Sequence, residues 1–387
     1  MHKAVQKVRL RTLHVVPSID LQRGAGLGAS AFTLHKQMLE EGFDSQLYTL
    51  ETGANGYLTE RDIVCPPAFS NNPFFFNPGS FELLNKLIAN VDVVHQHGLY
   101  THLNWCVGKC CATQKKLLVC HPHGTLAPWY LRRRRLQKRI VHWLFENRNF
   151  ARTDLWRAVT VVEAKEIRAF VPKAKIVVVP NGIRAEDFPS HADSNDKSFF
   201  HGLDSTRRWL LFFGRVVAVK GVDILISAWE ALPQFHDRWQ LVIAGPDCEG
   251  YLREAQRQIS RFSASAMPVF TGPLHAENKL RMLNAADLFI LPSRAEGFSV
   301  AALEAMAARK PVILSQACNF PEIELQAAGW ICRAEIEGIR NVLTEALQQS
   351  DADLKHRGEL ARSLIERKYT WRRAVELLNQ ATHACNT

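Results

Sequence analysis

Short apolar runs alternate with segments of helical spacing along the whole chain. This alternation is typical of βα units wound around parallel sheets. In the first half the expected strands are Thr12–Val16, Ser45–Thr49, Asp92–His95, Leu117–Cys120, Ala158–Val162 and Ile176–Val179. In the second half they are Trp209–Phe213, Gln240–Ala244, Pro268–Thr271, Asp287–Leu291 and Pro311–Leu314.

A polar stretch at residues 191–197 separates the two alternating series and reads as a linker. We therefore expect a first domain over 1–190, a linker over 191–207 and a second domain over 208–365. Residues 366–387 have helical spacing and are expected to pack back on the first domain. Both domains are predicted to be α/β and doubly wound, with ligands bound in a central cleft between the carboxyl ends of their sheets.

Composition agrees with two ordinary cores, since 47% of the 387 residues are hydrophobic. The nine cysteines form no disulfide framework. Four of them and His121 tempt a metal interpretation, but paired C-x-x-C ligands are missing, so we expect buried thiols and no metal. No apolar run is long enough to cross a bilayer and no secretory signal is evident. The sequence favours a soluble, cytoplasmic protein.

The net charge of +10 is concentrated in one segment. Between Pro128 and Arg152 there are eight basic residues and one acid, Glu146. An apolar stripe runs along the same segment and predicts an amphipathic helix with one packed face; its members are Leu136, Ile140, Trp143 and Leu144. The basic face, Arg132–Arg139, is either a solvated surface or an attachment to an anionic membrane, which we favour. Interleaved aromatic residues or a nucleic-acid-reading motif are lacking, so nucleic acid is not an expected partner.

Candidate chemistry lies where strands of the second domain end. Gly214 and Arg215 follow one strand, and Lys220 precedes the next helix. Two cations beside a helix amino terminus suit a diphosphate. The alternative is that both are solvated surface charges.

A second loop follows the strand that ends at Leu291. Ser299 is a plausible helix N-cap, Glu296 lies in the loop and Glu304 in the helix. A carboxylate accepts two hydrogen bonds and so suits a sugar or ribose diol. The helix is otherwise small and apolar, so a lone acid in it needs a partner.

These residues resemble the motifs of the large retaining GT-B glycosyltransferase family, glycosyltransferase family 4. Glu296 and Glu304 form its E-x7-E pattern, and Gly214–Arg215, Lys220–Gly221 and Pro180–Ile183 stand in the family's order. The resemblance covers nearly the whole chain. It implies a GT-B fold of two Rossmann-like domains, with the acceptor held by the first and the nucleotide sugar by the second.

The resemblance also implies roles for individual residues. Glu304 would bind the nucleotide ribose, Glu296 the transferred sugar, and Arg215 with Lys220 the diphosphate leaving group, without a metal. The segment 270–274 resembles the loop whose backbone holds the base. The remaining donor-binding matches are Gly214, Gly272, Leu274, Gly297, Phe298 and Ser299.

In the first domain, His123 belongs to a Pro-His-Gly sequence that resembles a subgroup of the family, followed by Pro128–Trp129 and a basic helix. The resemblance implies that His123 lies beside the transferred sugar. A histidine by itself is more often a structural hydrogen-bonding group. His97 ends a neighbouring strand and is a further acceptor-side candidate.

Glycines join the first strand to the first helix, where the family brings backbone close to its substrates. Gly24, Gly26 and Gly28 are spaced rather than adjacent, so which of them makes the contact stays open; Gly26 is the choice carried forward. The third glycine of a dinucleotide-binding fingerprint is missing, which argues against NAD(P).

The sequence therefore predicts transfer of a hexosyl group from a UDP- or GDP-sugar to a hydroxyl of a polysaccharide or lipid-linked acceptor. The anomeric configuration would be retained, and no cofactor is needed beyond the nucleotide sugar. The enzyme would lie in the cytoplasm, in part on the inner face of the membrane. The alternatives are a nucleotide-sugar 2-epimerase and a non-catalytic subunit that binds a sugar nucleotide.

Overall fold

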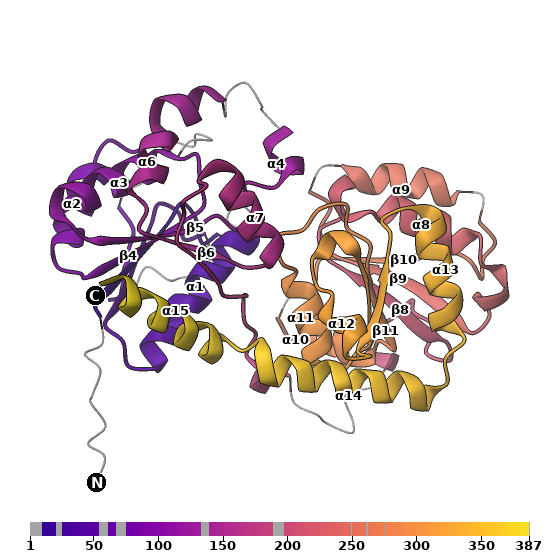
Figure 1. Cartoon of the computed structure of the whole chain (residues 1–387). Coiled ribbons are helices and arrows are strands. Elements are labelled where there is room, and N and C mark those ends of the chain that lie inside the picture. Colours follow the sequence, from indigo (N-terminus) through magenta and orange to yellow (C-terminus); the bar gives the residue numbers. More distant parts are fainter. Residues whose placement is uncertain are drawn as a thin grey trace, which may run out of the picture. The chain divides into compact units, whose positions relative to one another are not determined.

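The computed structural model describes residues 10–20, 25–53, 61–66, 75–132, 139–188, 197–248, 250–260, 262–274 and 276–386. The chain forms two compact units (Figure 1). Unit 1 comprises Met1–Asn181 and Trp371–Thr387, and unit 2 comprises Gly182–Thr370. Each unit is described by itself below.

Unit 1 is built on a seven-stranded parallel sheet of order β3-β2-β1-β4-β5-β6-β7. Its strands are β1 (Thr12–Val16), β2 (Ser45–Thr49), β3 (Ile63–Val64), β4 (Val93–His97), β5 (Leu117–His121), β6 (Leu155–Ala158) and β7 (Ile176–Val178). Its helical segments are α1 (Ala25–Glu40), α2 (Ser80–Ala89), α3 (His102–Gln114), α4 (Pro128–Arg132), η2 (His142–Glu146), α6 (Asn147–Arg152), α7 (Val161–Phe170) and α15 (Trp371–Asn386).

Alternate residues of the strands supply a core on each face of this sheet. On β4, Val94 packs into a cluster with residues of α2 and α3, while Val93 packs into a cluster with residues of α1 and α15. The strands are thus buried on both faces, as expected of a parallel sheet. His97 and His121 are the last residues of β4 and β5, and His14 and His95 lie in the middle of β1 and β4.

Unit 2 has a six-stranded sheet of order β10-β9-β8-β11-β12-β13. Its strands are β8 (Arg208–Phe213), β9 (Trp239–Ala244), β10 (Val269–Gly272), β11 (Leu288–Leu291), β12 (Val312–Ser315) and β13 (Gly329–Cys332), all parallel. Its helical segments are η3 (Ala185–Asp187), η5 (Lys197–Phe199), η6 (Ala218–Lys220), α8 (Val222–Glu230), η7 (Pro233–Phe235), α9 (Tyr251–Ile259), α10 (Ala276–Ala285), α11 (Val300–Ala307), η8 (Gln316–Cys318), α12 (Glu322–Leu325), α13 (Ile336–Leu347) and α14 (Asp351–Lys368).

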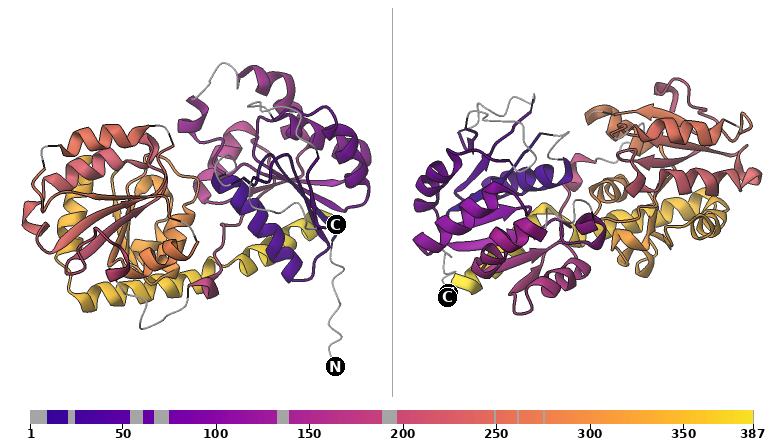
Figure 2. Two further views of the ribbon diagram at one scale, coloured as in Figure 1. Left: turned by 180° about the vertical axis from the view of Figure 1, so that it is seen from behind. Right: turned by 90° about the horizontal axis from the view of Figure 1, so that it is seen from above.

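The last helix returns the chain to unit 1. Trp371, Val375 and Leu378 of α15 are buried in one cluster with Leu34 and Met38 of α1. The α15 ribbon, in yellow, accordingly lies beside the indigo ribbon of α1 (Figure 2). The chain therefore passes into unit 2 at Gly182 and leaves it after Thr370, whereas the sequence suggested boundaries at 190 and 365.

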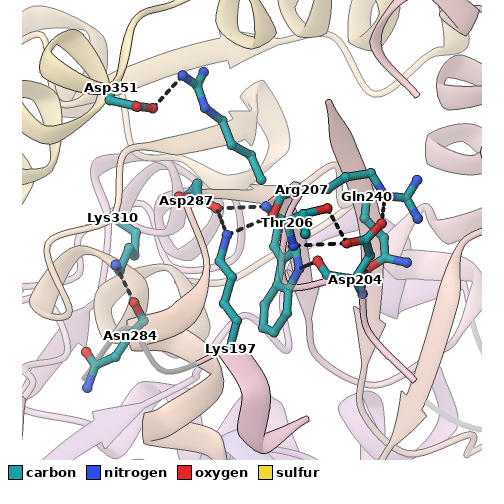
Figure 3. A network of polar contacts seen from close by, with 11 residues as sticks. Lys197, Asp204, Thr206, Arg207, Gln240, Asn284, Asp287, Lys310 and Asp351 are labelled. Atoms are coloured by element: carbon teal, nitrogen blue, oxygen red, sulfur yellow. Dashed lines mark hydrogen bonds and ion pairs between the residues drawn. The ribbon is translucent and has the colours of Figure 1, made fainter. Parts of the chain in front are cut away.

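The expected linker is part of unit 2 over its described residues, 197–207, because Phe200 and Leu203 pack on the core of that unit. A polar network closes the amino end of the sheet there (Figure 3). Asp287 accepts hydrogen bonds from Lys197 Nζ and from the backbone nitrogen of Trp209, both at 2.8 Å. Asp204 accepts from Arg207 Nε at 2.9 Å. These charges stabilise the amino-terminal end of the sheet, and the candidate site lies at its carboxyl end.

One expected strand is wrong. Residues 158–162 do not form a strand, because the Thr160 side chain accepts a hydrogen bond from the Glu163 nitrogen and caps α7, which begins at Val161. The strand lies earlier, at Leu155–Ala158, and contains the buried Arg157. The β-branched residues Val159–Val162, which suggested a strand, instead form the start of a helix.

Candidate functional site

The carboxyl end of the unit 2 sheet brings two loops close together. Gly214 N donates to Ala244 O at 3.0 Å, and a Cβ on Gly245 would lie only 1.9 Å from Gly214 O. Gly245 has φ of +142°, so glycine is required on both steric and conformational grounds. The chain after β8 is thereby held where Arg215 leaves the sheet.

Arg215 and Lys220 differ in their surroundings. Arg215 is exposed and makes no ion pair with any part of the chain that the structure describes. Lys220 ends η6, directly before the N-cap of α8. That cap, Gly221, has φ of +72°, and a Cβ there would lie 2.3 Å from Pro292 O. The loop after β8 is thus seated against the loop after β11.

Arg294 ties these two loops together. Its guanidinium donates to Asp223 Oδ1 at 2.8 Å and Oδ2 at 2.6 Å, in the bidentate arrangement that fixes geometry best. Its backbone nitrogen donates to Val219 O at 2.7 Å. Sequence reasoning missed Arg294 and Asp223, since 71 residues separate them.

Glu296 and Lys220, expected at a sugar and a diphosphate, pair with each other. Lys220 Nζ contacts Glu296 Oε1, which also accepts from Ser293 Oγ at 3.1 Å. The side chains are 17% and 10% exposed. Asn319 Nδ2 holds the backbone oxygen of Glu296 at 3.0 Å. The loop carboxylate is therefore positioned and its charge balanced.

Glu304 also has a partner, which sequence reasoning missed. Its Oε1 accepts from Lys279 Nζ of α10 at 2.6 Å, and its side chain is 12% exposed. Ser299 caps α11 as expected, accepting from Ala302 N at 3.3 Å. The apolar surroundings of Glu304 indicated that a partner must exist, but only the fold identifies Lys279.

The other expected donor-binding residues lie at the end of β10 and in the loop after β11. Gly272 has φ of +70°, and its oxygen accepts from Gly245 N at 2.8 Å. Leu274 packs partly on the core. Phe298 lies against Phe320 and Tyr369, with centroids 5.2 and 5.6 Å away, so its side chain is used in packing. Gly297 lies beside Phe298, in the same loop.

In unit 1, the two described glycines of the α1 start behave differently. A Cβ on Gly28 would lie 2.3 Å from Ser18 O, so Gly28 allows α1 to approach the loop after β1. Nothing lies within 4 Å of a Cβ placed on Gly26. Gly24 lies outside the described residues. Substrate contact by Gly26 stays a prediction, since packing explains Gly28 alone.

His123 joins a network of histidines that the sequence did not reveal. Its ring lies 2.9 Å (Nε2) from His97 Nδ1, and His97 Nε2 lies 3.0 Å from His14 Nδ1. A second pair joins His95 Nδ1 to His121 Nε2 at 3.0 Å. His14, His95, His97 and His121 are almost fully buried. Burial lowers the pKa of His95 and His123 to about 3, so these rings are neutral at pH 7.

One ring nitrogen from each of His97, His121 and His123 lies within 4.8 Å of the others, which is close enough to consider a metal. Several are already hydrogen-bonded to other rings. In addition, Arg157 Nη1 lies 3.4 Å from His121 Nδ1. A buried guanidinium beside the rings disfavours a further cation, so the arrangement fits a hydrogen-bond network better than a metal centre.

Two buried glutamates hold the loops after β4 and β5. Glu163 accepts from Gly124 N at 2.5 Å and Val159 N at 2.6 Å. Glu146 accepts from Tyr100 N at 2.5 Å and from Asn149 Nδ2 at 3.3 Å. The spacing Thr160 to Glu163 is a capping-box signal, which could have identified Glu163 from the sequence.

We expect Glu146→Gln to change how stability depends on pH. Burial raises the pKa of Glu146 from 4.5 to about 7, so folding favours its protonated form. Stability from this group is greatest below pH 4.5 and is lost as pH rises through about 7. The loss amounts to about 3 kcal/mol from the shift. Denaturant unfolding near pH 5 and pH 8 should show a smaller decline in Glu146→Gln than in the wild type.

Glu254→Gln, which removes an exposed carboxylate of unit 2, is the control and should decline like the wild type. An equal decline in all three proteins would contradict the role assigned to burial of Glu146.

The apolar stripe of the basic segment is not packed as expected. Ile140 is 58% and Trp143 75% exposed, and Leu144 and Phe145 are also exposed. Leu136 lies outside the described residues. Periodicity identified one face of a helix, but no element of the described chain covers that face. No helix among the described residues is long and apolar enough to cross a membrane.

Two glycosyltransferase families match the chain, one in each half. "Glycosyl transferases group 1" matches residues 193–371 and "Glycosyltransferase Family 4" matches residues 24–187. Together the two matches take in most of both units.

Several relatives are similar to this chain over part of their length. A lipopolysaccharide 1,2-N-acetylglucosaminetransferase of Salmonella typhimurium is 27% identical over 57% of this chain and 60% of its own. A GDP-mannose:cellobiosyl-diphosphopolyprenol alpha-mannosyltransferase of Xanthomonas campestris is 23% identical over 77% of this chain and 75% of its own. An uncharacterized glycosyltransferase of Methanocaldococcus jannaschii is 32% identical over 39% of each chain. The chain thus spans less than two thirds of the Salmonella relative and of the archaeal one.

Solved structures share the fold across the chain. Anabaena HepE in complex with UDP and glucose has a TM-score of 0.76 at 18% identity, over 98% of this chain and 100% of that one. WaaG, a glycosyltransferase involved in lipopolysaccharide biosynthesis, has a TM-score of 0.70 at 16% identity, over 97% and 98%. At such identities the likeness establishes the GT-B fold.

Proposed function

We infer that this protein is a hexosyltransferase. The chain belongs to the family 4 kind of GT-B glycosyltransferases. It moves a hexosyl group from a UDP- or GDP-sugar to a hydroxyl of a polysaccharide or glycolipid acceptor, with retention of configuration. The observation that carries the proposal is the pair of loops in unit 2. They place Arg215, Lys220, Glu296 and Glu304 at the carboxyl end of one parallel sheet, where such folds bind ligands.

Each of these side chains has a task in such a reaction. Arg215 is an exposed cation free of ion pairs within the described chain, and it stabilises the charge that develops on the departing diphosphate. Lys220 supplies a second cation, and Glu296 beside it accepts from hydroxyls of the sugar. Glu304, oriented by Lys279, accepts from the ribose hydroxyls.

The comparisons support a nucleotide sugar and a lipid-linked or polysaccharide acceptor. HepE has been solved with UDP-glucose, and the Xanthomonas relative takes GDP-mannose and a diphosphopolyprenol acceptor by its name. The Salmonella relative acts on lipopolysaccharide by its name.

Thermal unfolding with a panel of UDP- and GDP-sugars tests the donor. A ligand at one hundred times its Kd stabilises the folded state by about 2.7 kcal/mol, which raises Tm by a few degrees. NAD serves as the control and should leave Tm unchanged. The donor identified in this way is then incubated alone and with acceptors. Turnover of the donor to an epimer without an acceptor would replace the proposal by a 2-epimerase. Binding without any turnover would favour a non-catalytic subunit.

Metal independence follows from the cations already present. Arg215 and Lys220 supply positive charge at the diphosphate, so the proposed reaction needs no divalent ion. We expect transfer activity to survive excess EDTA without loss. Loss of activity that Mg²⁺ or Mn²⁺ restores would contradict the assignment of the leaving-group chemistry.

We further propose that the basic segment attaches unit 1 peripherally to the inner face of the membrane. Exposed Trp143 and Ile140 lie next to Arg139, which provides apolar area and positive charge together. Each basic residue near an anionic leaflet contributes about 1 kcal/mol, and that attraction is screened by salt.

Sedimentation with anionic vesicles at low salt should bring down the wild type, and Trp143→Ser should remain largely in the supernatant. Leu325→Ser is the matched control, because Leu325 is 77% exposed but lies on α12 of unit 2. Equal sedimentation of both variants, or none by the wild type, would show that the segment is only a solvated surface.

A further inference from the structure

The histidine network of unit 1 contains information about proton positions. A neutral imidazole has one nitrogen that donates a hydrogen bond and one that accepts. In a chain of neutral rings, the role of one nitrogen therefore fixes the roles of all the others. Unit 1 contains two series of hydrogen-bonded histidine rings. Each series ends on a group that can only donate or can only accept a hydrogen bond.

The first series of hydrogen-bonded rings, His14, His97 and His123, ends on Met38. Its sulfur lies 3.3 Å from His14 Nε2, and a thioether carries no hydrogen, so it can only accept. The Thr12 hydroxyl approaches the same sulfur at 3.9 Å. His14 must therefore be protonated at Nε2, because a lone pair there would face the lone pairs of sulfur. Its Nδ1 is then an acceptor.

The assignment propagates along the chain. His97 Nε2, 3.0 Å from His14 Nδ1, must donate, which leaves His97 Nδ1 as an acceptor. His123 Nε2, 2.9 Å from His97 Nδ1, must then donate in turn. The remaining nitrogen of the chain, His123 Nδ1, is left with a lone pair.

The second series of rings, His121 and His95, is assigned in the same way from Arg157 at its end. Arg157 can only donate, and its Nη1 lies 3.4 Å from His121 Nδ1, which is therefore an acceptor. His121 Nε2 then donates to His95 Nδ1 at 3.0 Å. The two series are stacked on each other, with the His97 and His121 centroids 4.3 Å apart. Burial lowers the pKa of all these rings, which keeps them neutral as the argument requires.

We propose that Met38, His14 and His97 are positioning residues that hold His123 as its Nε2–H tautomer and present its Nδ1 lone pair to a hydroxyl of the substrate. His123 is the one ring of the five that is only partly buried, and its Nδ1 makes no hydrogen bond with a residue of the described chain. Glu163 fixes the loop that carries it, through Gly124 N at 2.5 Å. The hydroxyl belongs to the sugar donor or to the acceptor, so this part rests on the proposed function.

The tautomer has a consequence for recognition. An acceptor nitrogen attracts a hydroxyl hydrogen and repels phosphate and carboxylate oxygens. In the opposite tautomer the same position would donate and would accommodate an anion. The buried chain thus selects a hydroxyl over an anion at His123, although neither Met38 nor His14 contacts the substrate.

Long-range ¹⁵N–¹H spectra of protein labelled with ¹⁵N-histidine test the tautomer directly. The His123 signals are assigned by their loss in His123→Asn. In the wild type we expect an unprotonated Nδ1 and a protonated Nε2 at His123. Met38→Leu keeps a similar side-chain volume but removes the accepting sulfur, and it should give a mixture of tautomers. Met282→Leu changes a buried methionine of unit 2 and should leave the spectrum as in the wild type.

A protonated Nδ1 at His123 in the wild type would overturn the proposal, and so would an unchanged tautomer in Met38→Leu. This measurement needs no substrate, so it stands or fails independently of the proposed function.

Kinetics then test the substrate hydroxyl. Met38→Leu should lower kcat/KM about fivefold, the equivalent of one neutral hydrogen bond. If the hydroxyl is on the donor, the Kd of the nucleotide sugar rises while that of the nucleoside diphosphate does not. If it is on the acceptor, the KM of the acceptor rises. A changed tautomer with unchanged kinetics would refute the contact between His123 Nδ1 and a hydroxyl.

Discussion

Arg215→Ala should lower kcat at least a hundredfold, a loss of about 3 kcal/mol of transition-state stabilisation, which is typical of removing one preorganised electrostatic donor. The effect falls on kcat rather than on folding, because Arg215 is exposed and pairs with no acid in the described part of the chain. The Tm of the variant should therefore equal that of the wild type. Steady-state kinetics with the identified donor measure the loss.

Arg253→Ala removes the same charge from an exposed position of α9 and should leave kcat unchanged. Arg215→Lys should recover part of the rate, because it restores the charge but not the planar fork of donors. Unchanged kinetics in Arg215→Ala would show that the diphosphate does not bind at this end of the sheet.

Lys220 would be a less clean test of the same chemistry. Lys220→Ala leaves Glu296 without its cation at a site where the carboxylate is only 10% exposed. Breaking a buried pair by removing one partner commonly costs several kcal/mol of stability. A loss of activity in that variant would mix catalysis with folding, whereas Arg215 separates them.

The sheets could be predicted largely from the sequence, because strands buried on both faces read as continuous apolar runs. Thr12–Val16 and Ser45–Thr49 are confirmed to the residue. The strands β3 and β13 were not identified from the sequence. The strand β6 was misplaced, because the buried Arg157 interrupts the apolar pattern and the following Val159–Val162 imitates a strand. Side-chain hydrogen bonds decide this case, and a pattern of hydrophobicity does not contain them.

The candidate site was predictable in its positions but not in its pairings. Residues after parallel strands collect at one edge of a sheet, so Arg215 and Glu296 could be placed from the order of elements. The partners come from distant parts of the chain: Lys279 reaches Glu304 across 25 residues, and His14 reaches His97 across 83. Register and helix packing set these contacts. For the same reason the apolar stripe at Trp143 could be recognised, but not the fact that it is uncovered.

Glu304→Ala should weaken nucleotide binding by about 2 kcal/mol, or roughly thirtyfold in Kd, the effect of losing hydrogen bonds to a charged acceptor. The carboxylate is held by Lys279 at 2.6 Å through Oε1, which leaves Oε2 for the ribose. Calorimetric titration with the nucleoside diphosphate measures the change. Glu337→Ala removes an exposed acid of α13 in the same unit and should bind as the wild type does.

A cycle with the 2′,3′-dideoxy nucleotide separates the ribose contact from a general effect of charge. The wild type should bind the dideoxy form about thirtyfold more weakly, since the buried carboxylate is then left without its hydroxyl partners. Glu304→Ala should bind both nucleotides equally, because the discriminating group is gone. If the variant still distinguishes the two nucleotides as strongly as the wild type, Glu304 does not contact the ribose. Its pairing with Lys279 would then serve only the packing of α10 against α11.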